Sequence, residues 1–155
     1  NETLWLHAVV SECEKRGDSR VTKKPPYSKE LIQYRMERAR ETLSTAKLLR
    51  DQNADAASIV NRAYYAMFYA ALAILATIGE ETSKHSGVLA LFDRNFIKTG
   101  ILPKEMGKFL HTAFDARQTG DYEDKLEISR AMAERIVEFA VQFVNSIEEK
   151  LRDQI

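Results

Sequence analysis

The chain is poor in cysteine, proline and glycine, and it carries no excess charge of either sign. Its 155 residues include 1 Cys, 3 Pro and 6 Gly, and 23 Lys and Arg balance 23 Asp and Glu. The lone Cys13 excludes an intrachain disulfide framework and a zinc site built from cysteines. Zero net charge leaves no global basic field, so any nucleic-acid binding must depend on a local patch.

Sequence motifs of the common catalytic classes are also missing. The chain contains no glycine-rich phosphate loop, no HExxH and no GxSxG. Its three histidines (His7, His85 and His111) are scattered, and no helix is expected to carry the Glu-x-x-His pairs of di-iron bundles. We therefore expect neither a metal site nor a cofactor. The chain begins without a secretory hydrophobic region, which favours a cytoplasmic location.

The dominant feature that is present is an apolar stretch, Asn61–Ile78, in the middle of the chain. No charged residue follows Arg62 within it, and no Gly or Pro interrupts it, so a helix is predicted. With the preceding ADAASIV it reaches about 25 residues, or roughly seven turns. The charge-free run is shorter than a membrane-spanning helix needs, which favours a buried helix of a soluble protein. Such a helix must be covered on nearly every side.

One long helix is predicted before the central helix, and capping residues indicate where both helices begin and end. Ser28 is a suitable N-cap for a helix that runs to about Asp51. Asn53 is the expected N-cap of the central helix, and Gly79 is expected to close it.

Three further helices are predicted after the central one. Thr82 or Ser83 would cap a short helix over 84–97, and Pro103 would be the first residue of a helix over Pro103–Arg117. A loop centred on Gly120 and a last helix over about Lys125–Arg152 complete the chain. The sequence therefore predicts an all-α fold, an up-down bundle of four or five helices around a buried central helix. Residues 1–27 are expected to form a short N-terminal helix and a basic linker, and residues 28–152 the bundle.

Three separated blocks carry a resemblance to a known family. They are NRAYYAMFYAALAIL, KHSGVLALFDRNFIKTGILP and AFDARQTGDYED. In these blocks the chain resembles the HEPN domain (higher eukaryotes and prokaryotes nucleotide-binding), and the similarity covers about Ser28–Arg152. HEPN domains are compact four- or five-helix bundles. The resemblance implies a homodimer that binds nucleotide or RNA and often works with a minimal nucleotidyltransferase as a toxin–antitoxin or defence pair.

Many HEPN proteins are metal-independent ribonucleases, whose signature is an Arg followed by a His four to six residues later. The corresponding stretch here begins at Arg117 but has Tyr122 in the place of the His. Tyrosine, with a reference pKa of about 10, is a poor base, and Asp121, with one of about 3.9, is a weak base. The sequence therefore predicts a nucleotide- or RNA-binding interaction module without the standard ribonuclease His. The alternative is a divergent ribonuclease toxin that uses Arg117 with Tyr122 or Asp121, or with His85 if it approaches in space.

No catalytic residue is assigned, and the candidate nucleotide- or RNA-binding residues are Arg62, Tyr65, Lys84, His85, Arg117, Asp121 and Tyr122. Arg117 either binds phosphate in a cleft or forms an ion pair at the end of its helix. Tyr122 either hydrogen-bonds a nucleotide or simply packs. Asp121 is expected to be a loop or N-cap residue rather than a base. A purely structural helical module is a third reading of the whole chain.

The other candidates lie near the central helix. Arg62 is expected to contact phosphate or to pair with an acidic residue such as Asp121 or Asp124. Lys84 and His85 start a helix, where backbone amides favour an anion, or else they form a solvent-exposed cap. Tyr65 belongs to a tyrosine group that is mostly core, with one member available to line a cleft.

Overall fold

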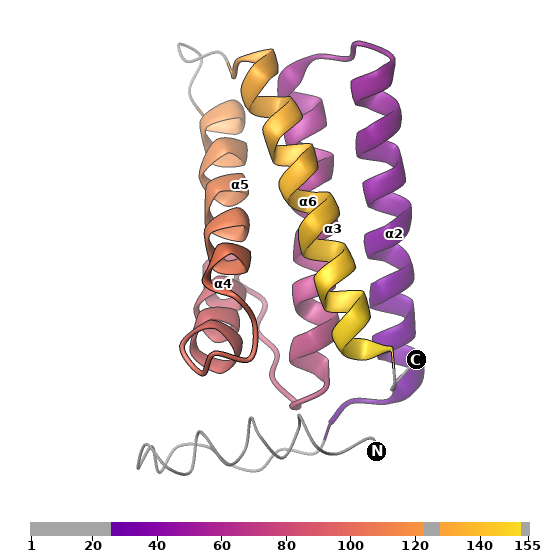
Figure 1. The fold of residues 1–155 in the computed structure, drawn as a ribbon, viewed down its shortest axis with the longest axis vertical. Helices are drawn as coiled ribbons and strands as arrows, with labels where there is room; N and C mark the ends of the chain where they lie inside the picture. The colour runs from indigo at the N-terminus through magenta and orange to yellow at the C-terminus, as the bar shows by residue number, and fades with distance from the viewer. Residues whose placement is uncertain (1–25, 123–127, 153–155) are drawn as a thin grey trace.

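The computed structural model describes residues 26–122 and 128–152. They form α2 (Lys29–Asp51), α3 (Ala56–Ala76), α4 (His85–Phe92), a π-helical turn η1 (Asp93–Ile97), α5 (Lys104–Tyr122) and α6 (Arg130–Leu151). The long helices α2, α3, α5 and α6 lie along one axis, and the short α4 lies beside the lower part of α5 (Figure 1). Within the described ranges no strand occurs. The predicted all-α up-down bundle is confirmed.

Helix α3 is the centre of this bundle, as its composition predicts. It packs against α2, α5 and α6, and the alanines from Ala63 to Ala76 are fully buried, as are larger side chains such as Met67 and Ile74. By length and composition α3 could cross a membrane, but 72% of the apolar window is buried inside the fold. One stripe of α3 stays partly exposed, and it consists of Tyr65, Phe68, Tyr69 and Leu72.

The sequence predicts the N-cap of α2 correctly but not that of α3. Ser28 caps α2 as expected, because its hydroxyl accepts a hydrogen bond from the Leu31 N–H at 3.2 Å. The prediction of Asn53 as the cap of α3 is wrong. Asn53 adopts a left-handed conformation (φ 56°) in the turn, and Asp55 caps α3 by accepting from the Ser58 N–H at 3.0 Å. That bond lowers the pKa of the Asp55 carboxyl.

The predicted short helix over 84–97 is divided in the structure. Lys84 is the N-cap residue of α4 and makes no side-chain capping bond, so the predicted caps Thr82 and Ser83 are wrong. A methyl group on Gly87 would lie 2.9 Å from the Thr82 side chain, which shows how closely that side chain packs on the first turn. The second half winds as a π-helical turn, closed by the Lys98 N–H and the Asp93 carbonyl at 2.8 Å.

The last two helices have other bounds than the sequence predicts. Helix α5 continues five residues beyond Arg117 to Tyr122, so the predicted loop around Gly120 is helical there. Helix α6 begins at Arg130 instead of Lys125, because the Ser129 hydroxyl accepts a bond from the Met132 N–H at 3.1 Å. The expected N-terminal helix and most of the basic linker lie outside the described residues, as do residues 125–127.

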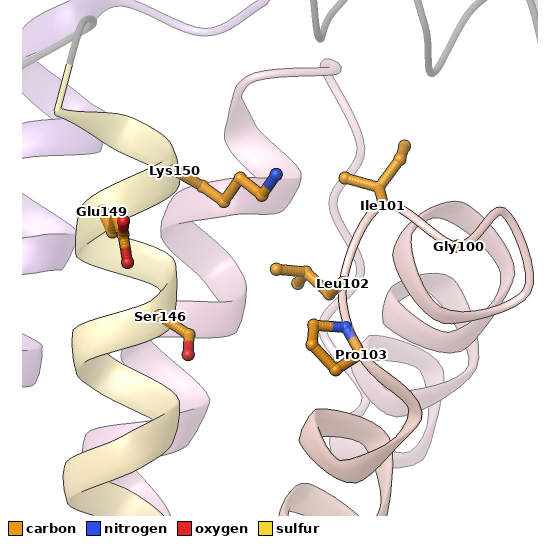
Figure 2. A pocket seen from close by; sticks show the side chains of 7 residues that line it. All are labelled: Gly100, Ile101, Leu102, Pro103, Ser146, Glu149 and Lys150. Carbon is orange, nitrogen blue, oxygen red and sulfur yellow. The ribbon is translucent and has the colours of Figure 1, made fainter.

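A hollow of about 690 Å³ lies between the C-terminal half of α6 and the segment before α5. Figure 2 shows Ile101, Leu102 and Pro103 on one side and Ser146, Glu149 and Lys150 of α6 on the other. Most of these residues are partly or fully exposed, and the charged pair among them is one carboxylate and one ammonium. No residue of this hollow belongs to the predicted site.

Candidate functional site

His85, the first residue of α4, lies against an aromatic face of α3. Its imidazole stacks on Phe68 with the ring centroids 4.3 Å apart and the planes 15° from parallel. The centroid of the Tyr65 ring, which lies nearly perpendicular to the imidazole, is 5.8 Å from that of His85, and the centroid of the Tyr64 ring is 5.9 Å from it. Because 64 and 68 are one turn apart on a helix, both rings reach the same side chain. His85 is half-buried in this setting, and the prediction of a solvent-exposed cap is wrong for it.

The polar groups of two residues converge on one nitrogen of His85. The Tyr64 hydroxyl lies 2.9 Å from Nδ1, and Nη1 of Arg117 lies 3.5 Å from the same atom. These residues come from three elements, α3, α4 and α5, and 32 residues separate His85 from Arg117 in the chain. The helical packing of α3 against α4 and α5 therefore assembles a Tyr–His–Arg cluster that no local sequence motif contains.

The guanidinium of Arg117 is held over two tyrosine rings. Its Cζ atom lies 5.3 Å from the centroid of Tyr64 and 5.1 Å from that of Tyr65, within the range of cation–π attraction. Helix α5 presents Arg117 there because Ala113 and Phe114, four and three residues earlier, pack in and against the core. The Phe114 ring also contacts Tyr64, with centroids 5.9 Å apart.

Burial sets the protonation states in this cluster. It lowers the pKa of His85 below its ordinary value of 6.5, and the positive charge of Arg117 lowers it further. Burial also raises the pKa of Tyr64, against a smaller opposing effect of Arg117. At neutral pH the cluster therefore holds a neutral imidazole and a neutral phenol beside a fixed cation.

The structure brings four of the seven predicted residues together and leaves three apart from them or outside the description. Arg62, Tyr65, His85 and Arg117 form one group, since the Arg62 Cζ lies 5.1 Å above the Tyr65 ring, which Arg117 also contacts. Lys84 is exposed and precedes His85 directly. Asp121 and Tyr122 lie in the last turn of α5, beyond Arg117, and their side chains are not described.

The expected acidic partner of Arg62 is not among its contacts within the described ranges. Instead Arg62 donates from Nε and Nη2 to the Asn61 side-chain oxygen, at 3.1 and 2.8 Å. Asp124 lies outside the described residues, and nothing is described of the Asp121 side chain. Arg62 thus adds a second guanidinium, hydrogen-bonded to a neutral residue, at the edge of the cluster.

Sequence reasoning missed Tyr64 and Phe68 as members of the cluster. It treated Tyr64 as core, and the ring is indeed fully buried. A fully buried phenol nevertheless needs a hydrogen-bond partner for its hydroxyl, and that requirement is a signal for a polar neighbour such as His85. Phe68 follows Tyr64 at helical spacing, which gave a signal for a shared face.

His111 takes no part in this cluster. It lies on α5, and its Nε2 is 2.5 Å from an Asp93 carboxylate oxygen of η1. In the part of the chain that is described, no group of three or more His, Cys, Asp and Glu side chains converges in a way that could hold a metal ion.

Comparison with known proteins shows a family that this chain matches. The chain matches the model of the HEPN domain over residues 32–150. It is 45% identical to a UPF0332 protein of Thermotoga maritima over 79% of the chain and 92% of that relative. Two proteins of Methanocaldococcus jannaschii, each named as a putative toxin, are also similar. One is 39% identical over 59% of the chain and 63% of the relative, the other 34% over 81% and 92%.

Proposed function

The chain belongs to the HEPN domain family, and we propose that it is a toxin-like module that binds a nucleotide or an RNA end at the Tyr–His–Arg cluster. The toxin-like character follows the names of its relatives. The ligand class follows from the residues of the cluster. A phosphate oxygen accepts hydrogen bonds, and Arg117 and His85 are donors of the kind that phosphate sites use.

The observation that carries this proposal is the approach of the Arg117 guanidinium to His85, with 3.5 Å between Nη1 and Nδ1. Arg117 is partly buried over two tyrosine rings, so its charge is less screened than that of a surface arginine. Arg62 adds positive charge over the same Tyr65 ring, and the exposed Lys84 directly precedes His85 in the chain. The chain as a whole has no net charge. A local basic patch of this kind is therefore what an anionic ligand would meet.

Tyr65 gives the cluster a surface for a base as well as for a phosphate. Its ring is half-buried, and its centroid lies 6.1 Å from that of Tyr69 along the exposed stripe of α3. Aromatic rings beside a cationic groove stack on nucleobases with little sequence preference. The stripe supports RNA or a nucleotide as the ligand over a simple inorganic anion.

The proposal is tested by the binding of a short fluorescent RNA, measured by anisotropy at several salt concentrations. We expect Arg117→Gln and His85→Gln each to weaken binding by about tenfold or more, since a charge-assisted hydrogen bond is lost. Arg40→Gln is the matched control, because Arg40 pairs with Glu148 of α6, away from the cluster. Absence of RNA and AMP binding at millimolar concentration, or equal effects of all three changes, would refute the proposal.

Metal-independent RNA cleavage is the second candidate function, and the same imidazole–guanidinium pair favours it. An imidazole can transfer a proton, and Arg117 can offset charge that develops on a phosphate. It ranks second because the Nδ1 atom of His85 is already in contact with Tyr64 and Arg117. Cleavage of a mixed RNA pool at pH 7 in EDTA, abolished by Arg117→Gln or His85→Gln, would make it the first.

The proposed partners are a second copy of this chain and a minimal nucleotidyltransferase, in a cytoplasmic toxin–antitoxin or defence pair. Both partners are what the resemblance to the HEPN domain implies. Sedimentation equilibrium tests the homodimer, and a single species of monomer mass at micromolar concentration would refute it. Co-purification with a nucleotidyltransferase encoded beside this chain tests the second partner.

A further inference from the structure

We propose that the Tyr64 hydroxyl holds His85 in the tautomer with its proton on Nε2, so that His85 serves as a neutral hydrogen-bond donor to a phosphodiester oxygen. Tyr64 is then a positioning residue that acts on the ligand only through His85. This inference deepens the proposed function and rests on it for the identity of the ligand. The tautomer itself is a property of the free protein.

The tautomer follows from the groups that face Nδ1. A guanidinium has no acceptor atom, so Arg117, with Nη1 at 3.5 Å, can only donate. A proton on Nδ1 would point at that cation and at its N–H groups. The Tyr64 hydroxyl, 2.9 Å away, can either donate or accept, and it is protonated at neutral pH. Only the lone pair of Nδ1 suits both neighbours, so Tyr64 donates and the ring proton of a neutral His85 is on Nε2.

The position of Tyr64 makes this arrangement rigid. The Tyr64 side chain, in the middle of the bundle, is 0% exposed, and its ring contacts Tyr65, Phe68 and Phe114. Its hydroxyl bonds His85 in the described structure, and a buried hydroxyl without a partner is costly. The Phe68 ring fixes the plane of the imidazole from one face. Turning the imidazole over about its Cβ–Cγ bond would put the Cδ2–H group in the place of Nδ1 and leave Tyr64 and Arg117 without that acceptor.

The other nitrogen is the one that remains for a ligand. Nε2 makes no hydrogen bond within the described residues, and His85 is only half-buried. On an imidazole the two nitrogens lie on opposite sides of the carbon between them, so fixing Nδ1 also fixes the direction of the Nε2–H group. A phosphodiester oxygen, which accepts but does not donate, is the matching partner for that group and for a guanidinium.

The tautomer can be read directly by ¹⁵N NMR of histidine-labelled protein at about pH 7.5. The His85→Gln variant identifies the His85 signals among those of the three histidines. We expect a protonated-type shift for Nε2 and an unprotonated-type shift for Nδ1. A proton on Nδ1 overturns the proposal, and this result needs neither RNA nor a Tyr64 variant.

The role of Tyr64 is tested by the pKa of His85, measured from the same signals as a function of pH. Removing a donor to Nδ1 destabilises the neutral ring, so in Tyr64→Phe the pKa should rise, by roughly 0.4–1 units. Tyr65→Phe is the matched control, because Tyr65 also borders His85 and Arg117, and its hydroxyl makes no hydrogen bond within the described residues. Equal pKa values in the wild type and the Tyr64→Phe variant overturn the role given to Tyr64.

Binding of a short RNA without terminal phosphates gives the functional readout. Phosphodiesters do not titrate between about pH 6.5 and 8, and a neutral donor needs no proton, so the affinity should change by less than about twofold over this range. A fall of fivefold or more as the pH rises would identify an imidazolium as the binding form and overturn the proposal. If RNA does not bind at all, the proposed function fails, while the two NMR results still decide the tautomer and the role of Tyr64.

Discussion

His85 and His111, the two histidines that the structure describes, have opposite surroundings. His85 is half-buried among aromatic rings, and its Nδ1 faces the Tyr64 hydroxyl and the Arg117 cation. His111 has 47% of its side chain exposed, and its Nε2 faces the Asp93 carboxylate, an acceptor. One imidazole is held by the core, while the other belongs to a surface pair. Their different environments predict different consequences when each is changed.

The positions of His85 and His111 also explain why spacing along the sequence could not show which histidine lies beside Arg117. His111 is on the same helix as Arg117, but six residues earlier, or about 9 Å along the axis. His85 is 32 residues away in the chain and yet lies beside Arg117. Contact across helices, rather than distance along the chain, decides which imidazole shares a site with the arginine.

The largest expected difference between the two histidines is in stability. His85→Ala leaves the buried Tyr64 hydroxyl without its bond and removes the ring stacked on Phe68. We expect a loss of about 2–3 kcal/mol in the free energy of unfolding. His111→Ala removes one exposed pair and should cost less than about 1 kcal/mol. Urea denaturation followed by circular dichroism measures both, and equal losses would contradict the comparison.

A smaller difference is expected in the pH dependence of stability. The pKa of His85 is lowered in the folded protein, by burial first and by Arg117 second, from an ordinary value of 6.5. The unfolded chain therefore takes up this proton first, and stability falls as the pH drops from about 7 toward the folded pKa. The slope from His85 stays below the one-proton limit of about 1.4 kcal/mol per pH unit.

Unfolding free energies measured between about pH 7.5 and 5.5 test this sign. The decline should be shallower in His85→Gln than in the wild type, and His111→Gln should retain the contribution of His85. A steeper decline in His85→Gln would mean that the folded protein prefers the imidazolium at this position.

The smallest expected effect is that of Asp93→Asn. This change removes the charge that faces His111 but keeps an oxygen that can accept its hydrogen bond. Because the pair is partly exposed, we expect a change of less than about 0.5 kcal/mol in unfolding free energy and none in RNA affinity. A loss of RNA binding in this variant would place the Asp93–His111 pair in the functional site.

The sequence predicts the helices of this protein better than it predicts the site. Buried positions are occupied by apolar residues, so burial produces the apolar run of α3 and the regular spacing of apolar residues in α6. The ends of helices are marked by weaker sequence signals. Helix α5 contains Gly107 as well as Gly120, and a helix tolerates each glycine at a cost of about 1 kcal/mol, so the presence of Gly120 alone did not mark a loop.

For the candidate site, the sequence predicted some of the residues but not how they are arranged. Arg62, Tyr65, His85 and Arg117 were named as candidates, and the structure brings them together. The role of Tyr64 could not be read from the chain, because a tyrosine in an apolar run is compatible with simple packing. Its partner became identifiable only when the packing of α4 against α3 fixed the position of His85.

All described members of the cluster lie between residues 62 and 117, an uninterrupted part of the chain. Helices α2 and α6, on either side of this part in the sequence, contribute cover to α3, and the first and last described residues lie at the same end of the bundle (Figure 1). The cluster should therefore not depend on where the chain begins and ends within the bundle. A circular permutant that joins those two ends by a linker and opens between Gln52 and Asn53 should fold and keep the cluster intact.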